Sequence, residues 1–379
     1  MSRAVLKEVS IGDVVVKAST WNPVRDAADD EIAYIDLSAI DNATKAVNGF
    51  QSLAGRDAPS RARQLVQAGD ILVSTVRPNL NGVARVPNEL DGATASTGFC
   101  VLSPRSGKVD SSFLFHWVQS ANFVDDMIRK ATGASYPAVS DKIIFQSTIP
   151  LPPLDEQKRI AAVLDQADEL RRKRQRAIDR LNQLGQAIFF EMFGDATTNP
   201  VGWPTKPLGE LAANEDGKRI PVKMSDRANV EGIYPYYGAS GIIDYVDGFI
   251  FDGERLLIGE DGANLLSRSS PLAFIARGKY WVNNHAHVLA FNGLANLRYL
   301  EFFIEAIDIS RYVSGSAQPK ITQKQLNSIE VPCPPMAIQE KFSEVINELE
   351  SQNAQMTASY NLSNQMFSSL QHRAFQGEL

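Results

Sequence analysis

Two long stretches of the chain place apolar residues three and four positions apart, the spacing that puts them on one face of an α-helix. The first stretch follows Pro153 and ends at Gly194, and the second follows Pro335. Each stretch predicts a helix of about 39 residues, roughly 58 Å long at 1.5 Å per residue. A helix of that length must bury its apolar face, so we expect the two helices to pack against each other rather than in two unrelated cores.

Shorter apolar runs, bounded by Gly, Asn and Pro residues, predict buried strands before each long helix. The four clearest runs are residues 34–37, 70–76, 256–259 and 286–290. Helical spacing returns at residues 113–128 and 297–307, which predicts one helix in each region. Both regions therefore have mixed α and β character, with strands first, then a helix and a short loop before the proline-rich start of the long helix.

The two halves of the sequence repeat each other. Residues 133–142 are similar to residues 315–324, and the shared proline gives the offset in residue number as 182 (319 minus 137). The match keeps this offset without a gap as far as Phe193 and Phe375. A constant offset over such a length indicates a duplicated domain rather than a short-period solenoid.

A fainter match lies upstream of each repeat. Residues 6–9 resemble residues 208–211 at an offset of 202 (208 minus 6). The two offsets differ by 20 (202 minus 182), so the two lobes would differ in length by the same amount. The expected order is a first lobe, a helix, a second lobe and a second helix. The corresponding boundaries are 1–153, 154–195, 196–335 and 336–379.

Composition is that of a globular protein, with 44% hydrophobic and 22% charged residues. No apolar run approaches the ~20 residues that span a bilayer, and the first residues have no signal-peptide pattern, so we expect a cytoplasmic protein. Cys100 and Cys333 lie far apart and indicate neither a disulfide framework nor a metal cluster. The net charge of -6 argues against tight DNA binding by the chain alone, because phosphate contacts need positive charge, which partner subunits could supply.

Several motifs point to one family. Residues 149–160 run from a proline-rich stop into the first long helix, and a weaker copy follows Val331. Residues 202–204 (Gly-Trp-Pro) open the second lobe, and residues 235–243 and 257–264 lie within it. Over nearly the whole chain, these segments resemble the specificity (S) subunits of type I restriction-modification systems.

This resemblance implies an α/β protein of mixed α and β structure, in which two long helices form an antiparallel coiled coil that joins and separates two globular target-recognition domains. Each domain would recognise one half of a split site in double-stranded DNA. The helices would dock methyltransferase (M) subunits, expected to be two, which carry S-adenosylmethionine. Restriction/translocase (R) subunits would join through the complex, and the chain itself would hold no cofactor and contact no membrane. The expected docking residues are Gln157, Ile160, Leu164, Gln339, Phe342 and Ile346.

The second copy of the helix motif departs from the family pattern. Residues 336–338 (Met-Ala-Ile) replace residues 154–156 (Leu-Asp-Glu), so the acidic first turn is missing from the second helix. Acidic residues there suit the helix dipole. The departure therefore concerns contacts of the first turn and not the helix itself.

Sequence motifs for catalysis were sought and not found. An adenine methyltransferase needs an Asn/Asp-Pro-Pro-aromatic tetrapeptide, and residues 199–201 (Asn-Pro-Val) are the nearest approach. No glycine-rich loop of the ATP-binding type is present. Residues 252–255 resemble a nuclease carboxylate pair but lack its lysine, and His285 and His287 have no third zinc ligand nearby in the sequence. We therefore expect a non-catalytic recognition subunit without a bound metal.

Base recognition needs Arg, Lys, Asn, Gln, Ser or Thr side chains on loops or helix ends. In the first lobe the candidates are Arg77, Asn79, Asn81, Ser96, Thr97, Tyr136 and Lys142. In the second lobe the candidates are Tyr236, Tyr237, Ser240, Lys279, Asn283, Asn284, His285, Gln318 and Lys320. The alternative for each is a loop residue whose polar atoms are satisfied within the chain. The basic run 171–176 with Arg180 is a candidate for phosphate contacts, against a solvated helix face or docking to an acidic partner.

The sequence thus predicts the DNA-specificity subunit of a type I restriction-modification complex. The alternative is an orphan specificity subunit that serves a methyltransferase alone or another defence system, and the neighbouring reading frames would separate these two. A scaffold whose coiled coil joins proteins without contacting DNA is a third possibility. It predicts no sequence-selective DNA binding.

Overall fold

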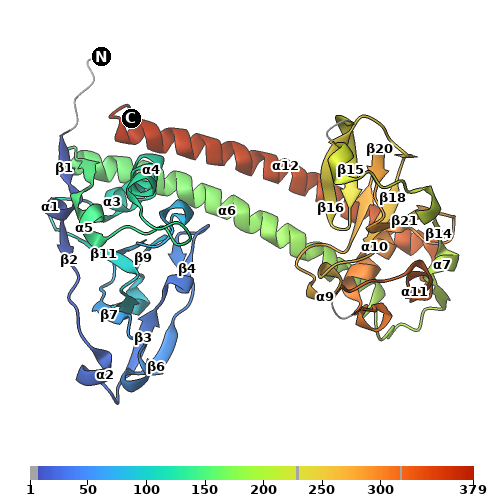
Figure 1. Ribbon diagram of the computed structural model, residues 1–379, viewed down its shortest axis with the longest axis horizontal. Helices are drawn as coiled ribbons and strands as arrows, with labels where there is room; N and C mark the ends of the chain where they lie inside the picture. Colours follow the sequence, from blue (N-terminus) through green and yellow to red (C-terminus); the bar gives the residue numbers. More distant parts are fainter. Residues whose placement is uncertain (1–6, 228–229, 316–317) are drawn as a thin grey trace. The chain divides into compact units, whose positions relative to one another are not determined.

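The computed structural model describes residues 7–379 except 228–229 and 316–317. The chain forms two compact units. Unit 1 consists of the residues up to Arg176 together with Ala358–Leu379, and unit 2 is Ala177–Thr357. The segments expected as separate helical connectors, 154–195 and 336–379, are each divided between the two units (Figure 1).

Unit 1 is built on two mixed sheets. The larger sheet has, in order, β2 (Val15–Lys17), β11 (Phe99–Pro104), β8 (Ile71–Ser74), β9 (Val83–Arg85), β5 (Ala46–Val47) and β4 (Ile40–Asp41). The smaller sheet has, in order, β6 (Gln51–Ala54), β3 (Glu31–Ile35), β10 (Thr94–Ser96) and β7 (Ala62–Leu65). The helices of unit 1 include α2 (Pro23–Asp26), α3 (Ser111–Trp117), α4 (Ala121–Lys130), α5 (Asp141–Gln146) and the N-terminal part of α6 (Leu154–Phe193). Strands β3 and β6, with α2, lie at the end of unit 1 away from α6 (Figure 1).

Unit 2 is built on two sheets of four strands each. One is antiparallel, in the order β14 (Ala212–Asn214), β21 (Ala286–Phe291), β18 (Arg255–Gly259) and β19 (Ala273–Ala276). The other is mixed, in the order β16 (Gly241–Val246), β15 (Glu231–Gly238), β20 (Lys279–Val282) and β17 (Phe251–Asp252). The helices beside them include α10 (Leu297–Ala306), α11 (Gln323–Asn327) and the N-terminal part of α12 (Met336–Phe375). The main core of unit 2 joins the antiparallel sheet to α10 and to both long helices.

The two long helices predicted from the apolar spacing are confirmed as α6 and α12, each of 40 residues. They pair antiparallel within each unit. In unit 1, the guanidinium of Arg171 on α6 lies over the ring of Phe367 on α12, 4.9 Å from its centroid. In unit 2, Phe189 and Phe193 near the end of α6 pack against Phe342 near the start of α12, with ring centroids 5.6 and 5.3 Å apart. The predicted mutual packing is therefore confirmed.

The predicted strands 70–76, 256–259 and 286–290 are confirmed by β8, β18 and β21, and the predicted helix 297–307 is confirmed as α10. The predicted strand 34–37 only overlaps β3, which ends at Ile35, and Leu37 begins a short 3-10 helix. Residues 113–128, predicted as one helix, instead form two, because α3 ends at Trp117 and α4 begins at Ala121. The side chain of Ser120 accepts a hydrogen bond from the backbone N–H of Phe123 and caps α4. Serine favours this capping position over a helix interior, and the apolar spacing did not reveal the interruption.

The structure corrects the upstream part of the repeat. Strand β1 (Glu8–Ser10) pairs with β12 (Thr148–Pro150), and β13 (Thr205–Pro207) pairs with β22 (Glu330–Pro332). The short helices that follow are α1 (Ile11–Val14) and α7 (Leu208–Leu211). The offset between equivalent positions is thus 197 (208 minus 11), and the match of residues 6–9 at an offset of 202 is wrong; residue 6 itself lies outside the described residues. The difference in lobe length becomes 15 (197 minus 182) instead of 20.

One glycine in each short helix fixes this register. A Cβ added to Gly12 would lie 3.2 Å from the main-chain oxygen of Phe145 on α5. A Cβ added to Gly209 would lie 2.9 Å from Cβ of Asn327 on α11. Phe145 and Asn327 are themselves related by the offset of the repeat (327 minus 145 is 182). The same close approach between a short helix and the helix before the connector is therefore built twice.

Helix α10 carries a buried carboxyl group whose ionisation is expected to affect stability. Glu301 and Arg298 form an ion pair at 2.5 Å, and Arg298 also bonds to Glu350 of α12 at 2.6 Å. Burial raises the pKa of Glu301 from an ordinary 4.5 to about 7, and Arg298 offsets only part of that rise. Between these two values the folded chain holds a proton that the unfolded chain releases. The free energy of unfolding should therefore fall as pH rises from about 4.5 to 7.

A Glu301→Gln variant is expected to lose this pH dependence, because glutamine does not titrate. In unit 2 of the parent, unfolding by urea should become easier between pH 5 and 7, with a slope of at most about 1.4 kcal/mol per pH unit from this group. The variant should show a flatter profile and be no less stable at pH 7. Identical slopes for both proteins would contradict the assignment.

Candidate nucleic-acid interface

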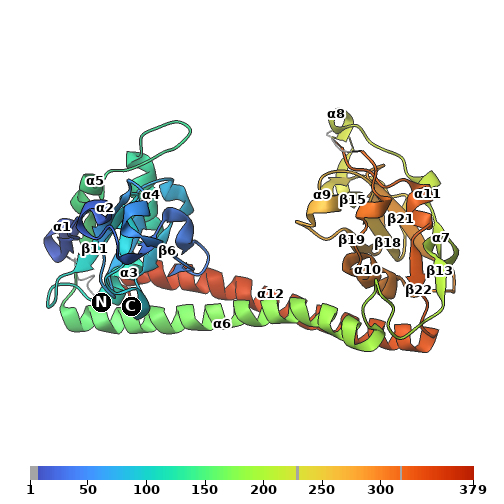
Figure 2. The same cartoon turned by 90° about the horizontal axis from the view of Figure 1, so that it is seen from below.

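In unit 1, three segments meet next to the end of β8. They are the turn after β8 (residues 75–81), the turn between β10 and β11 (residues 97–98) and the loop between α4 and α5 (residues 131–140). The N–H of Thr75 donates to the carbonyl of Gly98 at 2.9 Å, and its own carbonyl accepts from Val139 at 2.9 Å. In Figure 2 the loop after α4 extends on the side of unit 1 away from α6. Backbone hydrogen bonds thus hold together segments far apart in the sequence.

The same three segments meet in unit 2. The N–H of Glu260, which follows β18, donates to the carbonyl of His285 at 2.8 Å. The carbonyl of Glu260 accepts from Ile321 at 2.9 Å, and the N–H of Gly262 donates to Pro319 at 2.9 Å. The last bond matches the one from Arg77 to Pro137 in unit 1. Each unit therefore presents an equivalent cluster of three loops, which we call its recognition loops.

Arg77 and Tyr136 come together in the recognition loops of unit 1. The guanidinium of Arg77 lies 4.7 Å from the centroid of the Tyr136 ring, and the tyrosine is 68% exposed. Arg77 has a φ of +51°, a left-handed conformation that is uncommon for a residue other than glycine and that concentrates at functional sites. It forms no ion pair within the part of the chain that the structure describes. An exposed arginine without a carboxylate is free to bind an external acceptor.

The other candidates of unit 1 divide into exposed and enclosed residues. Asn79 and Thr97 are exposed on these loops, and Lys142 is exposed on α5. Ser96 is fully buried in β10, where its hydroxyl accepts from the N–H of Gly98, so the structure does not present it for a DNA contact. Asn81 is half-buried and donates to the carbonyl of Gln119 at 3.1 Å, so its amide is held inside the unit.

In unit 2, two of the candidates are likewise buried, and the structure does not present them for a DNA contact. Tyr236 is fully buried, with its hydroxyl bonded to the backbone of Val222. Asn283 is 4% exposed, and its side chain accepts from the N–H of His285 at 2.8 Å. Tyr237 is half-buried against Phe274. Tyr236 and Asn283 were candidates because of their polar atoms, but these atoms form hydrogen bonds inside unit 2.

The exposed candidates of unit 2 are Ser240, Lys279, Asn284, His285, Gln318 and Lys320. The turn that carries Ser240 approaches β18 closely, because a Cβ on Gly259 would lie 2.9 Å from the carbonyl of Ala239. Lys279 begins β20, whereas Asn284 follows the end of that strand, and the ammonium of Lys279 lies over Phe249. The structure therefore gathers these candidates at the recognition loops, except for Lys279.

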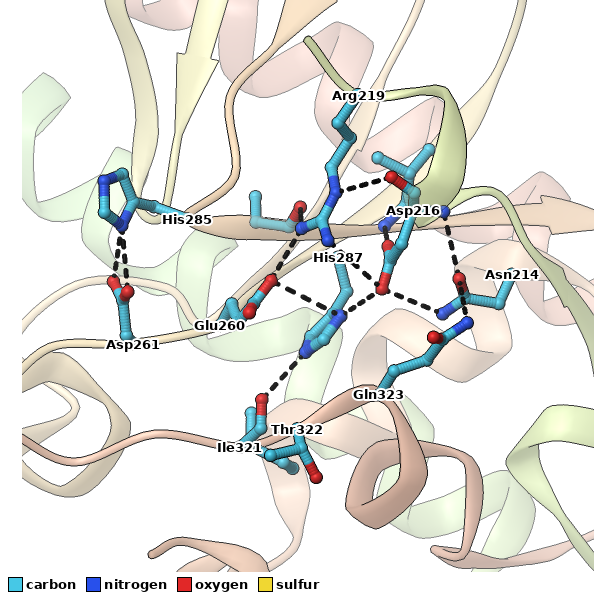
Figure 3. Close-up of polar contacts among 12 residues, drawn as sticks. Asn214, Asp216, Arg219, Glu260, Asp261, His285, His287, Ile321, Thr322 and Gln323 are labelled. Carbon is cyan, nitrogen blue, oxygen red and sulfur yellow. Dashed lines mark hydrogen bonds and ion pairs between the residues drawn. The ribbon is translucent and has the colours of Figure 1, made fainter. Parts of the chain in front are cut away.

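A buried charge network underlies the recognition loops of unit 2 (Figure 3). The network joins four segments of the chain that are far apart in sequence. Its members are Asp216 and Arg219 on one segment, and Glu260, His287 and Lys320 on the others. Glu260 bonds to Arg219 at 2.6 Å and to Lys320 at 2.9 Å. His287 bonds to Asp216 at 2.6 Å and to the carbonyl of Ile321 at 2.9 Å. Asp216, Arg219 and Glu260 were not among the sequence candidates.

The two ring nitrogens of His287 lie 2.6 Å from a carboxylate oxygen of Asp216 and 2.9 Å from the carbonyl oxygen of Ile321. Burial alone would raise the pKa of Asp216, but the hydrogen bond from His287 lowers it overall. The pKa of Glu260 is lowered in the same way, because bonds from Arg219 and Lys320 outweigh its burial. These contacts therefore favour the charged forms of both carboxyl groups.

Oxygen and nitrogen atoms of Asp216, Glu260 and His287 lie within 4.8 Å of one another, as the ligands of a metal ion would. Glu260 already binds two cationic side chains, Arg219 and Lys320, and His287 already bonds to Asp216 and to the carbonyl of Ile321. His285, the other histidine considered for zinc, faces away and pairs with Asp261 at 2.9 Å. In the structure these groups form a salt-bridge network.

The six side chains expected to dock partner subunits are all buried within this chain. Ile160, Leu164, Phe342 and Ile346 are at most 2% exposed, and they belong to the cores of their own units. These four side chains are therefore not exposed for docking in the structure, and their docking role stays a prediction. Apolar spacing shows that a helix face is buried, but not whether its own lobe or another protein covers it.

Gln157 and Gln339, the remaining two, have a shared structural role. Gln157 accepts from the N–H of Asp110 and donates to the carbonyl of Pro152, at 2.9 Å in both cases. Gln339 accepts from the N–H of Asn296 at 2.9 Å and donates to the carbonyl of Pro334 at 2.7 Å. Asp110 and Asn296 each precede the lobe helix, so these glutamines fasten the long helices to α3 and α10.

The basic run on α6 is largely engaged within the chain. Arg171 and Arg172 both bond to Asp168, and Lys173 bonds to Glu169 at 2.7 Å. Arg174 bonds to the hydroxyl of Ser363 on α12. The exposed arginines that remain available for a phosphate are Arg176 and Arg180.

A family model, individual relatives and solved structures all show similarity to type I restriction-modification specificity proteins. A family described as "Type I restriction modification DNA specificity domain" matches residues 8–180 and 200–362. A type I restriction enzyme specificity subunit of Haemophilus influenzae is 38% identical over 144 residues, covering 38% of this chain and 36% of the relative. The MjaIX specificity subunit of Methanocaldococcus jannaschii is 21% identical over 375 residues, covering 91% and 82%. The chain spans about a third of the length of the first relatives it matches.

Two solved structures share the fold. One is a chain described as "Structural basis underlying complex assembly and conformational transition of the type I R-M system", with a TM-score of 0.62 and 23% identity over 100% of both chains. The other is a type I restriction-modification S subunit of M. genitalium, with a TM-score of 0.64 and 14% identity over 99% of this chain and 97% of that chain. Both likenesses support the mixed α and β fold with two long helices.

Proposed function

This chain belongs to the family of type I restriction-modification DNA specificity proteins, and we propose that it is the subunit that selects the DNA sequence for such a complex. In this proposal each unit recognises one half of a split site in double-stranded DNA. The chain contributes no catalytic group; methylation is carried out by methyltransferase subunits and cleavage by restriction subunits of the complex. We assign it to the cytoplasm, where DNA is accessible and where Cys100 and Cys333 would stay as free thiols.

The observation that carries the proposal is the repeated cluster of recognition loops. Two copies of one arrangement of loops carry different exposed side chains, with Arg77 and Tyr136 in unit 1 and Asn284 and Gln318 in unit 2. A duplicated scaffold with divergent loop residues suits the recognition of two different half-sites. Loops held by a rigid scaffold are also where binding residues concentrate.

Arg77 is the residue we assign to base recognition in the first half-site. An arginine can donate two hydrogen bonds to O6 and N7 of guanine in the major groove. The contact with Tyr136 orients the guanidinium and leaves its N–H groups exposed. Asn79 and Thr97 lie on adjoining loops and could bind neighbouring base edges.

The methyltransferase subunits are proposed to dock on exposed apolar side chains of the long helices. Leu170, Leu362 and Met366 in unit 1 are 51%, 58% and 64% exposed. Leu184 and Phe190 in unit 2 are 42% and 62% exposed. Exposed leucine and phenylalanine on helices that are otherwise packed favour an external protein surface. Restriction subunits would join through the same complex, and among the described residues no helix has the length and apolarity to cross a membrane.

An Arg77→Ala variant is expected to relax recognition at one half-site by about tenfold or more, the loss typical of one bidentate base contact. The other half-site should be recognised as before, because unit 2 folds on its own contacts. Methylation of a library of sites by the variant in complex with its methyltransferase measures both halves at once. Arg25→Ala is the matched control, since Arg25 is exposed on α2 and pairs only with Asp26. An equal loss at both half-sites would show that Arg77 contacts phosphate or supports the fold.

A further inference from the structure

Three positions of the charge network of unit 2 carry uncharged residues in unit 1, although the backbone bonds of the recognition loops match. In the paired strands His287 faces Ile258 and Cys100 faces Val73, so His287 is equivalent to Cys100. The backbone bonds of the recognition loops make Glu260 equivalent to Thr75. Lys320 is equivalent to Ala138, because each forms a backbone bridge with the residue six positions before it in the sequence. The duplicated fold therefore forms with uncharged residues at all three positions.

Burying such charges has an energetic cost that hydrophobic packing would avoid. The side chains of His287, Asp216 and Glu260 are 1%, 6% and 10% exposed. Because the recognition loops of unit 1 make the matching backbone bonds without these charges, those bonds alone do not require them. Their retention in unit 2 points to a task specific to that unit.

The contacts of the network indicate what that task is. Glu260 follows β18 and binds Lys320 in the loop before α11. His287 binds the carbonyl of Ile321, next to Lys320 in the same loop. Arg219 binds both Glu260 and the carbonyl of Ala286, next to the turn that carries His285. One connected set of charges therefore ties together all three recognition loops of unit 2.

Lys320 forms an ion pair within this network, so its ammonium group is not available as a free cation. Its ammonium lies 2.9 Å from a carboxylate oxygen of Glu260, and the loop around it is closed by the backbone pair of Ser314 and Lys320. A lysine that binds DNA phosphate would be expected to lack such a carboxylate. The exposed groups left to face DNA on these loops are the side chains of Asn284 and Gln318.

Resting on the proposed function, we propose that Glu260, with Arg219, His287 and Lys320, positions the recognition loops of unit 2, so that discrimination at the second half-site depends on this network and discrimination at the first does not. Glu260 is the central positioning residue, because it alone bonds to both a loop cation and an interior cation. The network acts through loop geometry, and none of its members needs to contact a base.

The test uses the full chain in complex with its methyltransferase and measures methylation across a library of sites. Glu260→Gln keeps the shape of the side chain and removes its charge. Lys320→Met removes the ammonium group that binds Glu260, at an exposed position. Both variants should lower discrimination at the second half-site by about tenfold, the order of one mismatched base pair. The first half-site should be unchanged. The double variant should lose no more than either single variant, because both break the same contact.

Two further variants separate positioning from other roles. Lys320→Arg keeps a cation that can bind Glu260 and should retain discrimination. Glu215→Gln is the matched control: Glu215 is 14% exposed and binds Arg255 and Lys218, so it loses the same charge in the same unit without touching the recognition loops. It should retain discrimination as well. Thermal unfolding of each variant identifies any that fails to fold. If Glu260→Gln fails to fold, the test rests on Lys320→Met, which changes an exposed side chain.

Unchanged discrimination in Lys320→Met, with unit 2 folded, would overturn the proposal. So would a uniform drop in methylation at all sites without loss of discrimination, since that pattern belongs to a phosphate contact. Failure of the proposed function itself looks different: the parent complex would then methylate no sequence motif in either half, before any variant is compared.

Discussion

Deleting Ala358–Leu379 is expected to unfold unit 1 and to leave unit 2 folded, although these residues lie far from the first lobe in the sequence. Phe375 gives the reason. It is 4% exposed, and its ring centroid lies 5.2 Å from that of Phe113 and 5.0 Å from that of Trp117. Losing one buried aromatic residue costs about 3–5 kcal/mol, while a whole domain is stable by only about 5–15 kcal/mol.

Hydrogen exchange measures this outcome for each unit. Backbone amides of β8 and β11 should lose their protection in the truncated chain, and those of β18 and β21 should keep it. Phe375→Ala should reproduce much of the effect, whereas Met366→Ala, at a position 64% exposed on the same helix, should have little effect. Continued protection of β8 and β11 after the deletion would mean that α12 is not part of the core of unit 1.

Phe342→Ala should destabilise unit 2 by about 3–5 kcal/mol and lower its melting temperature by roughly 10 °C. The side chain of Phe342 is fully buried, and its ring packs edge-on against Phe189, Phe193 and Phe302, with centroids 5.6, 5.3 and 5.1 Å apart. Alanine leaves a cavity among three aromatic rings, which cannot close without moving α10.

Calorimetry of the isolated chain distinguishes this role from partner docking. Val345→Ala is the matched control, because Val345 lies one turn further along α12 and is 36% exposed. It should change the melting temperature by a few degrees at most. An isolated Phe342→Ala chain that melts like the parent, but no longer binds methyltransferase, would instead favour docking as the role of Phe342.

Much of the fold could be predicted from the sequence because its signals are local or repeated. Apolar spacing gave both long helices, and the constant offset from Gly133 and Gly315 onward gave the duplication. The upstream offset was wrong because so short a match does not fix a register. The close packing of Gly12 and Gly209 against a neighbouring helix, which fixes that register, is visible only in three dimensions.

The site was predicted less completely, for a physical reason. Loop residues such as Arg77 and Tyr136 could be chosen one at a time, but their contact joins the turn after β8 to the loop between α4 and α5. Asp216 and His287 are 71 residues apart, and neither stands in a motif that indicates their bond. Buried polar candidates such as Ser96 and Tyr236 were chosen for their chemistry, which the core itself uses.

Sequencing of methylated bases in a host that expresses this chain with its cognate methyltransferase tests the central proposal most directly. We predict one new methylated motif, split into two specific half-sites with an unspecified spacer between them, because two units carry separate recognition loops. Exchanging unit 1 loop residues should alter one half-site, and exchanging unit 2 loop residues should alter the other. A host with no new motif, or with a single undivided one, would contradict the proposal that each unit recognises half of a split DNA site.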